Sequence, residues 1–290
     1  MTTGRFSEAM SYVPEDGICR EVILTSSVSG ERFRLAIWKP AKHKSRLRCI
    51  YVFDGDDHFG MMTRQASAYA LAGGDAPAVV AIGYPPNART VERRIFDLTP
   101  PAAQYIMPDR PNGAPWPQLG GGDDLLKTVE QDAKPLVAEF CGKLPSEATL
   151  FGHSLGGLMA LYAFSLYTEK YDRYFASSPS IWFNDRSILN TVERRLNAAI
   201  LQPVALQVTV GSAEEYLVMK KRCGPSADPA KRAAWIAGNR MVSNVRDLAR
   251  IVGRRQLPNL DFSWSECIGA DHHSVLPFAI QKAVCSSWVN

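Results

Sequence analysis

The sequence predicts an α/β fold, with a mixed central sheet that becomes mostly parallel and is covered by helices on both faces. Short runs rich in β-branched and aromatic residues recur along the chain, and helical patterns lie between the later runs. Early strands with short connections, followed by strands that alternate with helices, are typical of such sheets. The predicted strands span residues 20–26, 32–38, 48–53, 78–84, 148–153, 204–210 and 261–267.

The predicted helices follow from apolar residues that recur at helical spacing. The clearest example spans residues 123–142, where Asp123 or Asp124 is expected to cap the start and Pro135 predicts a kink. Another helix is expected directly after Ser154, and a long basic helix is expected within residues 230–251. No Pro/Ser-rich linker divides the chain, so we predict one domain over residues 1–290.

Composition narrows the class of protein. Of the 290 residues, 46% are hydrophobic and 21% are charged, which is ordinary for a globular protein and argues against disorder. No apolar run approaches the roughly 18 residues of a membrane span, and the N-terminus lacks the features of a signal peptide. We therefore expect a cytoplasmic protein, or a periplasmic one if a signal peptide has been removed, and no membrane partner.

Cysteine usage and charge add two further points. The six cysteines are scattered without a C-x-x-C pair, which argues against zinc-ribbon and thioredoxin-like sites and favours buried thiols over disulfides. The net charge is unevenly distributed, because residues 216–255 carry +8 and the rest of the chain carries −4. Charge asymmetry of this kind bears on which molecules a protein binds.

One motif indicates a nucleophilic serine. The sequence GHSLG at 152–156 stands directly after a predicted strand and directly before a helix rich in small residues. A nucleophile elbow requires this strand-to-helix turn, and it requires flanking glycines because a side chain there would collide with the strand or the helix. The pattern predicts Ser154 as the nucleophile of an α/β-hydrolase fold. The alternative is a glycine-rich loop with an incidental serine.

A nucleophilic serine needs a base, and the chain has five histidines. Three of them are badly placed for this role: His43, His58 and His153. The last of these is part of the elbow and is expected to point away from the serine. The fold's chain order is Ser, acid, His, which selects the loop after the last predicted strand. We favour His272 over its neighbour His273, because adjacent residues cannot both face the serine.

The acid is expected where the strand after the elbow's helix ends. Glu214 and Glu215 follow the strand at 204–210, and we prefer Glu214. Asp271 is the alternative and would make the site closer to a Ser–His dyad. The acid holds the imidazole tautomer and stabilises the imidazolium. This mechanism uses no metal and no cofactor, and we predict neither.

The oxyanion hole needs two backbone N–H groups. One is expected at Leu155, directly after the nucleophile, and the other in the loop after the third strand, FDGDDHF, at Gly55 or Asp56. A metal loop built on Asp54, Asp56 and Asp57 is the alternative, but the oxygen-ligand spacing of a calcium loop does not follow.

The basic segment at 216–255 lies between the predicted acid and His272, where this fold tolerates lids. We therefore predict a basic helical insertion that draws an anionic substrate toward the nucleophile, with Lys220, Lys221 and Arg222 as its most basic run. A solvated helix surface is the alternative. Nucleic-acid binding, in which Trp235 would stack on a base, is disfavoured because no recognised module is present.

Most of the chain, from about residue 20 to the end, resembles the "putative esterase" branch of the α/β-hydrolases. This branch includes esterase D, bacterial feruloyl esterases and hydrolases of ferric catecholate siderophores. The motifs that carry the resemblance are YVFDGDDHF, RIFDLTP, GGGDD, GHSLGG, ASSPSIWFN, VGSAE and DHHSVLP.

The siderophore hydrolases are the most similar members, and the resemblance to them carries specific implications. The arginine of their R-x-x-D-x-T-P element, which matches Arg94, contacts an anionic substrate, and Trp182 is a second substrate-binding residue. Their histidine matches His272 rather than His273. The implied reaction is cleavage of the ester backbone of a catecholate trilactone such as enterobactin or bacillibactin, free or iron-bound. The alternatives are a general short-chain or aryl carboxylesterase and a binding protein that has kept the fold without the chemistry.

Overall fold

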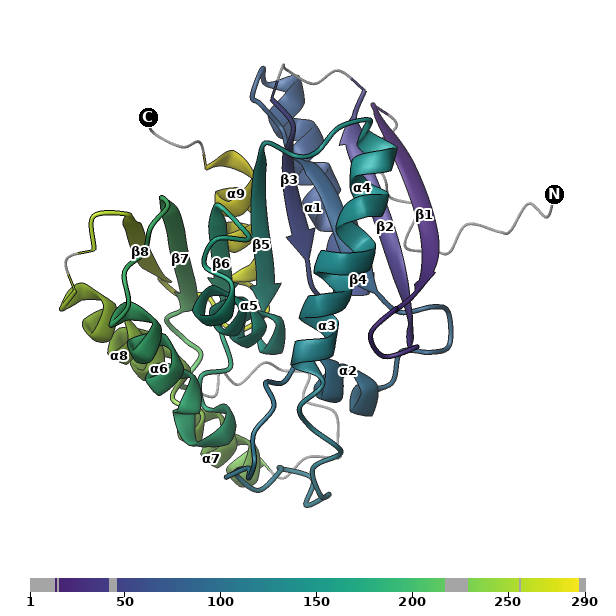
Figure 1. The fold of residues 1–290 in the computed structure, drawn as a ribbon. Helices are drawn as coiled ribbons and strands as arrows, with labels where there is room; N and C mark the ends of the chain where they lie inside the picture. Colours follow the sequence, from purple (N-terminus) through teal and green to yellow (C-terminus); the bar gives the residue numbers. More distant parts are fainter. Residues whose placement is uncertain (1–13, 15, 42–45, 217–228, 256, 287–290) are drawn as a thin grey trace. The chain divides into compact units, whose positions relative to one another are not determined.

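The computed structural model describes residues 14, 16–41, 46–216, 229–255 and 257–286. These residues belong to two compact units, and Figure 1 labels their helices and strands. The first unit comprises Met1–Thr90, Asp124–Phe151 and Ile280–Asn290, and the second comprises Val91–Asp123 and Gly152–Ala279.

The sheet of the first unit is antiparallel at one edge and parallel beyond it. Its strands are β1 (Gly17–Thr25), β2 (Arg32–Pro40), β3 (Arg48–Val52), β4 (Ala78–Gly83) and β5 (Glu147–His153), the last of which continues into the second unit. Their order is β1-β2-β4-β3-β5. The pairs β1–β2 and β2–β4 are antiparallel, whereas β3 pairs parallel with β4 and β5. Every residue of β3 and β4 is buried, as expected for strands that are covered on both faces.

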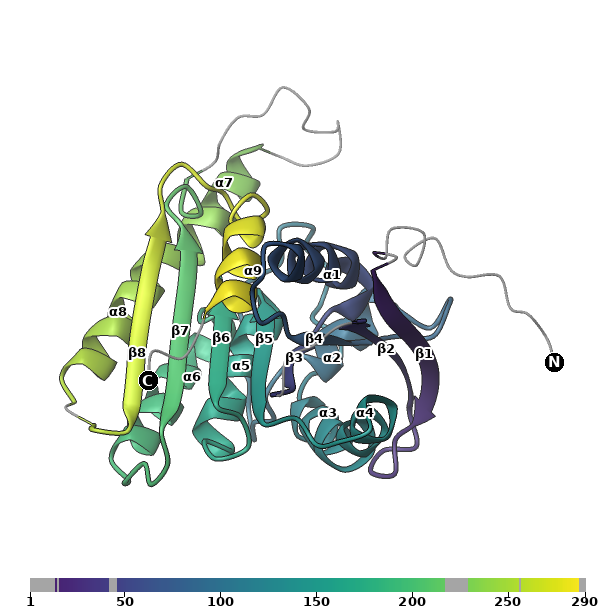
Figure 2. The same cartoon turned by 90° about the horizontal axis from the view of Figure 1, so that it is seen from above.

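Helices cover both faces of this sheet. α1 (Gly55–Leu71) connects the parallel strands β3 and β4, and in Figure 2 it lies on the opposite face from α4 (Lys134–Cys141). The kink predicted at Pro135 takes the form of a π-helical turn, η2 (Val129–Ala133), directly before α4. A proline has no N–H to donate to the preceding turn, so the backbone widens locally instead of continuing as a regular α-helix.

Three parallel strands form the sheet of the second unit, in the order β6 (Arg173–Ser177), β7 (Val204–Gly211) and β8 (Leu260–Cys267). Parallel neighbours need crossover connections, and helices supply them. α6 (Phe183–Leu196) joins β6 to β7, and α8 (Met241–Gly253) joins β7 to β8. The remaining helices are α2 (Val91–Asp97), α3 (Gly122–Thr128), α5 (Leu155–Leu166), α7 (Pro229–Gly238) and α9 (Leu276–Cys285).

The seven predicted strands are all present, and one strand, β6, was not predicted. The single long helix expected within residues 230–251 is two helices, α7 and α8. α8 buries an apolar face, including Val242, Val245 and Leu248, and packs against β7 and β8. This part of the 216–255 segment is therefore a crossover helix of the sheet, which differs from the lid that the sequence suggested.

Two smaller expectations concern helix starts and thiols. α3 begins at Gly122, so Asp123 and Asp124 lie in its first turn instead of capping it. The five cysteines in the described part of the chain are free thiols, and Cys223 lies outside that part. Within the same described ranges, no helix has both the length and the apolar character of a membrane span.

Candidate active site

Ser154 lies in a strained turn between β5 and α5. Its backbone has φ 61° and ψ −118°, outside the conformations that side-chain-bearing residues normally adopt. The neighbouring glycines make this turn feasible. A Cβ atom on Gly152 would lie 2.0 Å from the carbonyl oxygen of Gly156, and one on Gly157 would lie 2.8 Å from that of Ser177. The strand, the turn and the helix can therefore come this close only with glycine at both positions.

A short segment that begins at the end of β6, Ser177–Ser180, holds this turn in place. The backbone N–H of Ser154 donates to the Ser177 carbonyl at 2.9 Å, and the N–H of Ser180 donates to the Ser154 carbonyl at 3.0 Å. The Ser180 hydroxyl oxygen lies 3.4 Å from that of Ser154. The strained backbone of the serine is therefore fixed on both sides by one neighbouring segment.

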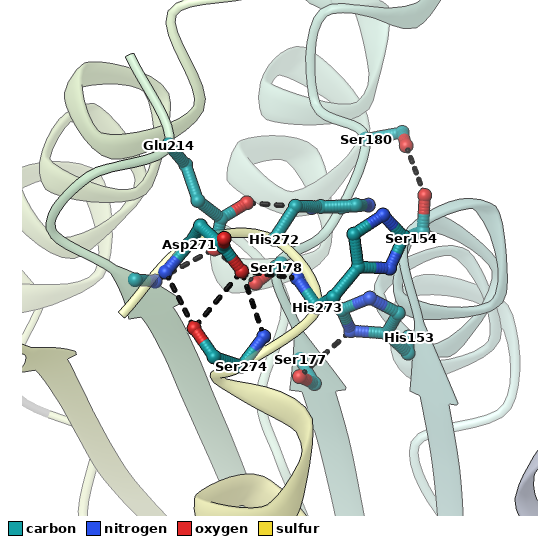
Figure 3. Close-up of polar contacts among 11 residues, drawn as sticks. His153, Ser154, Ser177, Ser178, Ser180, Glu214, Asp271, His272, His273 and Ser274 are labelled. Atoms are coloured by element: carbon teal, nitrogen blue, oxygen red, sulfur yellow. Dashed lines mark hydrogen bonds and ion pairs between the residues drawn. The ribbon is translucent and has the colours of Figure 1, made fainter. Parts of the chain in front are cut away.

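His272 and Glu214 form a direct contact. His272 Nδ1 lies 2.6 Å from Glu214 Oε2, and the Glu214 side chain is almost completely buried. The other oxygen, Oε1, accepts hydrogen bonds from the Ser178 hydroxyl at 2.5 Å and from the Gly211 N–H at 2.7 Å. Figure 3 shows the His272 ring between the Glu214 carboxylate and the Ser154 hydroxyl. A carboxylate fixed by three donors orients the imidazole, because neither partner can turn without losing a bond.

The alternative acids have other partners. Glu215 accepts hydrogen bonds from the backbone N–H of Ser243 at 2.5 Å and from its hydroxyl at 3.0 Å, and so it caps the first turn of α8. The Asp271 carboxylate accepts bonds from the N–H groups of His273 and Ser274 and from the Ser274 hydroxyl. Asp271 thus shapes the loop that carries His272.

The other histidines have local partners as well. The His153 ring is buried against the His272 ring, with centroids 4.6 Å apart, and its Nδ1 lies 3.0 Å from the Ser177 hydroxyl oxygen. His58 is buried, with Nδ1 3.1 Å from the Phe53 carbonyl oxygen. His43 lies outside the described residues. The contact between His153 and His272 was not expected from the sequence.

The predicted oxyanion donors lie at the starts of two helices. Leu155 is the first residue of α5, where a backbone N–H has no acceptor within its own helix. The FDGDDHF stretch is not a loop, because α1 begins at Gly55, preceded by Asp54 in the left-handed conformation at φ 54°. Gly55 and Asp56 are therefore in the first turn of α1, whose dipole favours negative charge.

The Asp56 side chain has a separate, structural role. Its carboxylate lies 3.1 Å from Arg34 and accepts a hydrogen bond from the N–H of Tyr84 at 2.9 Å. Burial raises the pKa of the Asp56 carboxyl, and these two partners oppose the shift. Asp54 and Asp57 both lie near the guanidinium of Arg89. Among the residues that the structure describes, no cluster of three or more His, Cys, Asp or Glu residues suits a metal ion.

Arg94 lies half-buried in the last turn of α2. Asp97, three residues further on, is buried and pairs with Arg93, whose Nε lies 3.4 Å from its carboxylate. The Thr99 hydroxyl of the same RIFDLTP element accepts a hydrogen bond from the N–H of Gly120 at 2.8 Å. The element thus anchors the glycine-rich turn before α3.

Several arginines of the basic segment at 216–255 form ion pairs with acidic residues. On and beside α8, Arg240 and Arg250 pair with Asp247, Arg246 pairs with Glu266, and Arg255 pairs with Glu193. Lys231 and Arg232 are exposed on α7. The run Lys220, Lys221 and Arg222 lies outside the described residues.

The contacts made by two groups of residues near Ser154 were not predicted, although Trp182 itself was expected to bind the substrate. The serines of the Ser177–Ser180 segment each contact one other member of the site, although the ASSPS motif itself was visible in the sequence. Trp182 follows this segment and lies against Trp116 and Trp235. Spacing along the chain gave no signal for either group, because both depend on segments that only the fold brings together.

Comparison with known proteins identifies the family. Residues 26–246 match the protein family described as "Putative esterase". A siderophore enterobactin esterase from Emericella nidulans is 35% identical over 215 residues, which is 71% of this chain and 70% of the relative. The ferri-bacillibactin esterase BesA from Bacillus subtilis is 30% identical over 244 residues, which is 81% of this chain and 76% of the relative.

Solved structures agree with this assignment. The siderophore hydrolase EstA from Aspergillus nidulans has a TM-score of 0.79 at 27% identity, with 98% of this chain and 97% of that chain covered. The BES protein from Bacillus cereus has a TM-score of 0.74 at 28% identity, with 93% and 95% covered. The predicted fold class and the predicted enzyme class are both confirmed. The chain belongs to this esterase family, has the α/β-hydrolase type of fold and is a carboxylic ester hydrolase.

Proposed function

We propose that this esterase cleaves the backbone esters of a catecholate siderophore, with Ser154 as nucleophile, His272 as general base and Glu214 as the acid that orients it. The observation that carries the mechanism is the buried Glu214 carboxylate 2.6 Å from His272 Nδ1, in the same unit as the strained Ser154. The names of the relatives support the substrate class.

The contact with Glu214 sets the state of the imidazole. A carboxylate accepts hydrogen bonds, so Nδ1 carries the proton and Nε2 of His272 keeps its lone pair. Nε2 can then take the hydroxyl proton of Ser154 as Oγ attacks the ester carbonyl. The imidazolium that forms beside the buried carboxylate is stabilised by it, and this stabilisation is larger in the transition state than in the resting enzyme.

The remaining steps follow from the same groups. The tetrahedral intermediate carries a negative oxygen, and the N–H of Leu155 is the first proposed donor to it. The first-turn amides of α1, at Gly55 or Asp56, remain the predicted second donor. The ester C–O bond then breaks, and the leaving alkoxide takes the proton from His272. Water, activated by the same histidine, hydrolyses the acyl group from Ser154 and restores the enzyme.

The substrate proposal rests on charge as well as on similarity. A tris-catecholate complex of iron carries about three negative charges, and a basic surface beside a site raises the local concentration of such an anion. Exposed Lys231 and Arg232 on α7 provide positive charge, and Arg94 is the proposed contact to the substrate. A plain short-chain esterase has no need of this charge.

Product analysis tests the proposal. Wild-type protein is incubated with enterobactin, with ferric enterobactin and with p-nitrophenyl butyrate, and products are identified by mass spectrometry, with Ser154→Ala as the control. We expect linear trimer, dimer and monomer of dihydroxybenzoylserine from the wild type only. Turnover of the p-nitrophenyl ester with intact trilactone would show a general carboxylesterase instead.

A further inference from the structure

Three tryptophans from three separate segments meet in the second unit, and we call them the tryptophan cluster: Trp116, Trp182 and Trp235. The ring centroids of Trp182 and Trp235 are 5.3 Å apart, those of Trp116 and Trp182 are 5.9 Å apart, and those of Trp116 and Trp235 are 6.2 Å apart. These separations are within the range of direct aromatic contact. The chain has six tryptophans in all, so half of them gather at this one place.

Local contacts fix the rings that come from loops. Trp182 stands between Ile181 and Phe183, both of which are fully or almost fully buried, so its neighbours anchor the backbone on each side. The indole N–H of Trp116 donates to the Pro108 carbonyl at 2.8 Å. The guanidinium of Arg110 lies 5.4 Å from the centroid of the Trp116 ring, within the range of a cation–π contact.

The cluster is not a closed core. All three indoles remain partly exposed, in contrast to Trp38, which is completely buried. Large aromatic surface that stays accessible and is bordered by cations suits a ligand that is both aromatic and anionic. The nearby cations are Arg110, beside Trp116, and Lys231, which is one helical turn before Trp235 on α7.

The cluster is also connected to the nucleophile. Trp182 is two residues after Ser180, whose hydroxyl oxygen is 3.4 Å from that of Ser154. Two peptide units span at most about 7.6 Å between Cα atoms, so the backbone of Trp182 lies within a short reach of the reacting serine. An acyl group attached to Ser154 would therefore lie close to the backbone that carries Trp182.

We propose that the tryptophan cluster, together with Arg110, is a binding site for an aryl group of the substrate, such as the dihydroxybenzoyl arm of a catecholate siderophore. The proposal rests on the siderophore esterase function proposed above and adds the site that selects an aromatic over an aliphatic acyl arm. A ring that packs between the indoles gains aromatic contact, and ionised catechol oxygens lie near the cations.

Binding without turnover tests this site. In a Ser154→Ala background, calorimetry measures the Kd of N-(2,3-dihydroxybenzoyl)serine and of N-hexanoylserine, which has the same carboxylate and an aliphatic acyl chain. Trp182→Leu and Trp235→Leu should each weaken binding of the aryl ligand about 2- to 10-fold and leave the aliphatic ligand unchanged. Trp235→Phe keeps a ring and should recover most of the loss. Trp264→Leu removes a partly exposed indole on β8 outside the cluster and serves as the matched control.

The outcomes separate the two proposals. Equal losses for both ligands, or no loss for either in variants that keep the circular dichroism spectrum of the parent, would overturn the aryl site and leave the cluster as an anchor for α7. Because no ester is cleaved in this experiment, it measures the preference for an aryl group alone, and cleavage of the trilactone is measured separately by product analysis.

Discussion

Removal of the Ser178 hydroxyl tests whether the orientation of Glu214 is needed for catalysis. The Ser178 side chain is completely buried, and its hydroxyl donates to Glu214 Oε1 at 2.5 Å. In Ser178→Ala this oxygen keeps only the N–H of Gly211, at 2.7 Å, so the carboxylate is held at one point fewer while its contact with His272 remains possible in other orientations.

The expected loss of activity follows from the type of hydrogen bond that is removed. A hydrogen bond to a charged group contributes about 1.5–3 kcal/mol, and the surviving donor on the same oxygen offsets part of its loss. If about 1.4 kcal/mol is lost from the transition state, kcat/KM falls about tenfold. Replacement of an acid in this role by its amide costs about 10⁴-fold, so the Ser178 effect should be well below that of Glu214→Gln.

The assay is kcat/KM for p-nitrophenyl acetate, which reports acylation of Ser154. Ser178 has φ 42°, so Ser178→Gly removes the hydroxyl without asking another side chain to adopt the left-handed conformation. Both variants should lose activity about equally. Ser177→Ala, whose hydroxyl contacts His153 and not the acid, is the matched control and should lose less. If both Ser178 variants keep the wild-type kcat/KM while Glu214→Gln loses most of its activity, the positioning role of Ser178 is refuted.

The remaining predictions concern the base, the acid and substrate charge. His272→Ala should lower kcat by several orders of magnitude and His273→Ala should be mild; equal effects in steady-state assays would contradict the choice of base. Glu214→Gln should impair kcat far more than Glu215→Gln, which should mainly lower the melting temperature through loss of the α8 cap; the reverse order would exchange their roles. Arg94→Ala should raise KM for the siderophore and not for a neutral ester; equal increases would indicate a structural role. Raising salt from 50 to about 200 mM should lower kcat/KM for the siderophore alone, and equal salt slopes would exclude electrostatic steering.

Local pattern was sufficient for much of the fold. Seven strands could be predicted because their β-branched and aromatic runs are continuous and are bounded by turn residues. β6, Arg173–Ser177, was missed because Tyr174 and Phe175 are its only strand-favouring residues, whereas the equally short β3 has a continuous apolar run from Cys49 to Val52. The start of α1 was mistaken for a loop, because FDGDDHF has loop composition and its helix begins only after Asp54 adopts a left-handed conformation.

Prediction of the active site from the sequence was limited in a different way. The elbow at Ser154 could be predicted because strand, turn and helix are contiguous in the sequence. Spacing favoured Glu214 but left Glu215 open, since one residue along a turn changes which side chain faces the histidine loop. In the structure, Glu214 contacts His272, and Glu215 accepts a hydrogen bond from the Ser243 hydroxyl. Contacts such as Ser178 with Glu214 join segments 36 residues apart and leave no periodic signal.

The most direct test of the account is detection of a covalent acyl group on Ser154 during siderophore turnover. The enzyme is mixed with enterobactin, quenched in acid within the first turnovers and digested, and the peptide that contains Ser154 is analysed by mass spectrometry. We expect a dihydroxybenzoylserine-containing adduct on this residue that disappears as hydrolysis is completed and never forms in Ser154→Ala. Cleavage of enterobactin by the Ser154→Ala protein, at a rate near that of the wild type, would contradict the central claim.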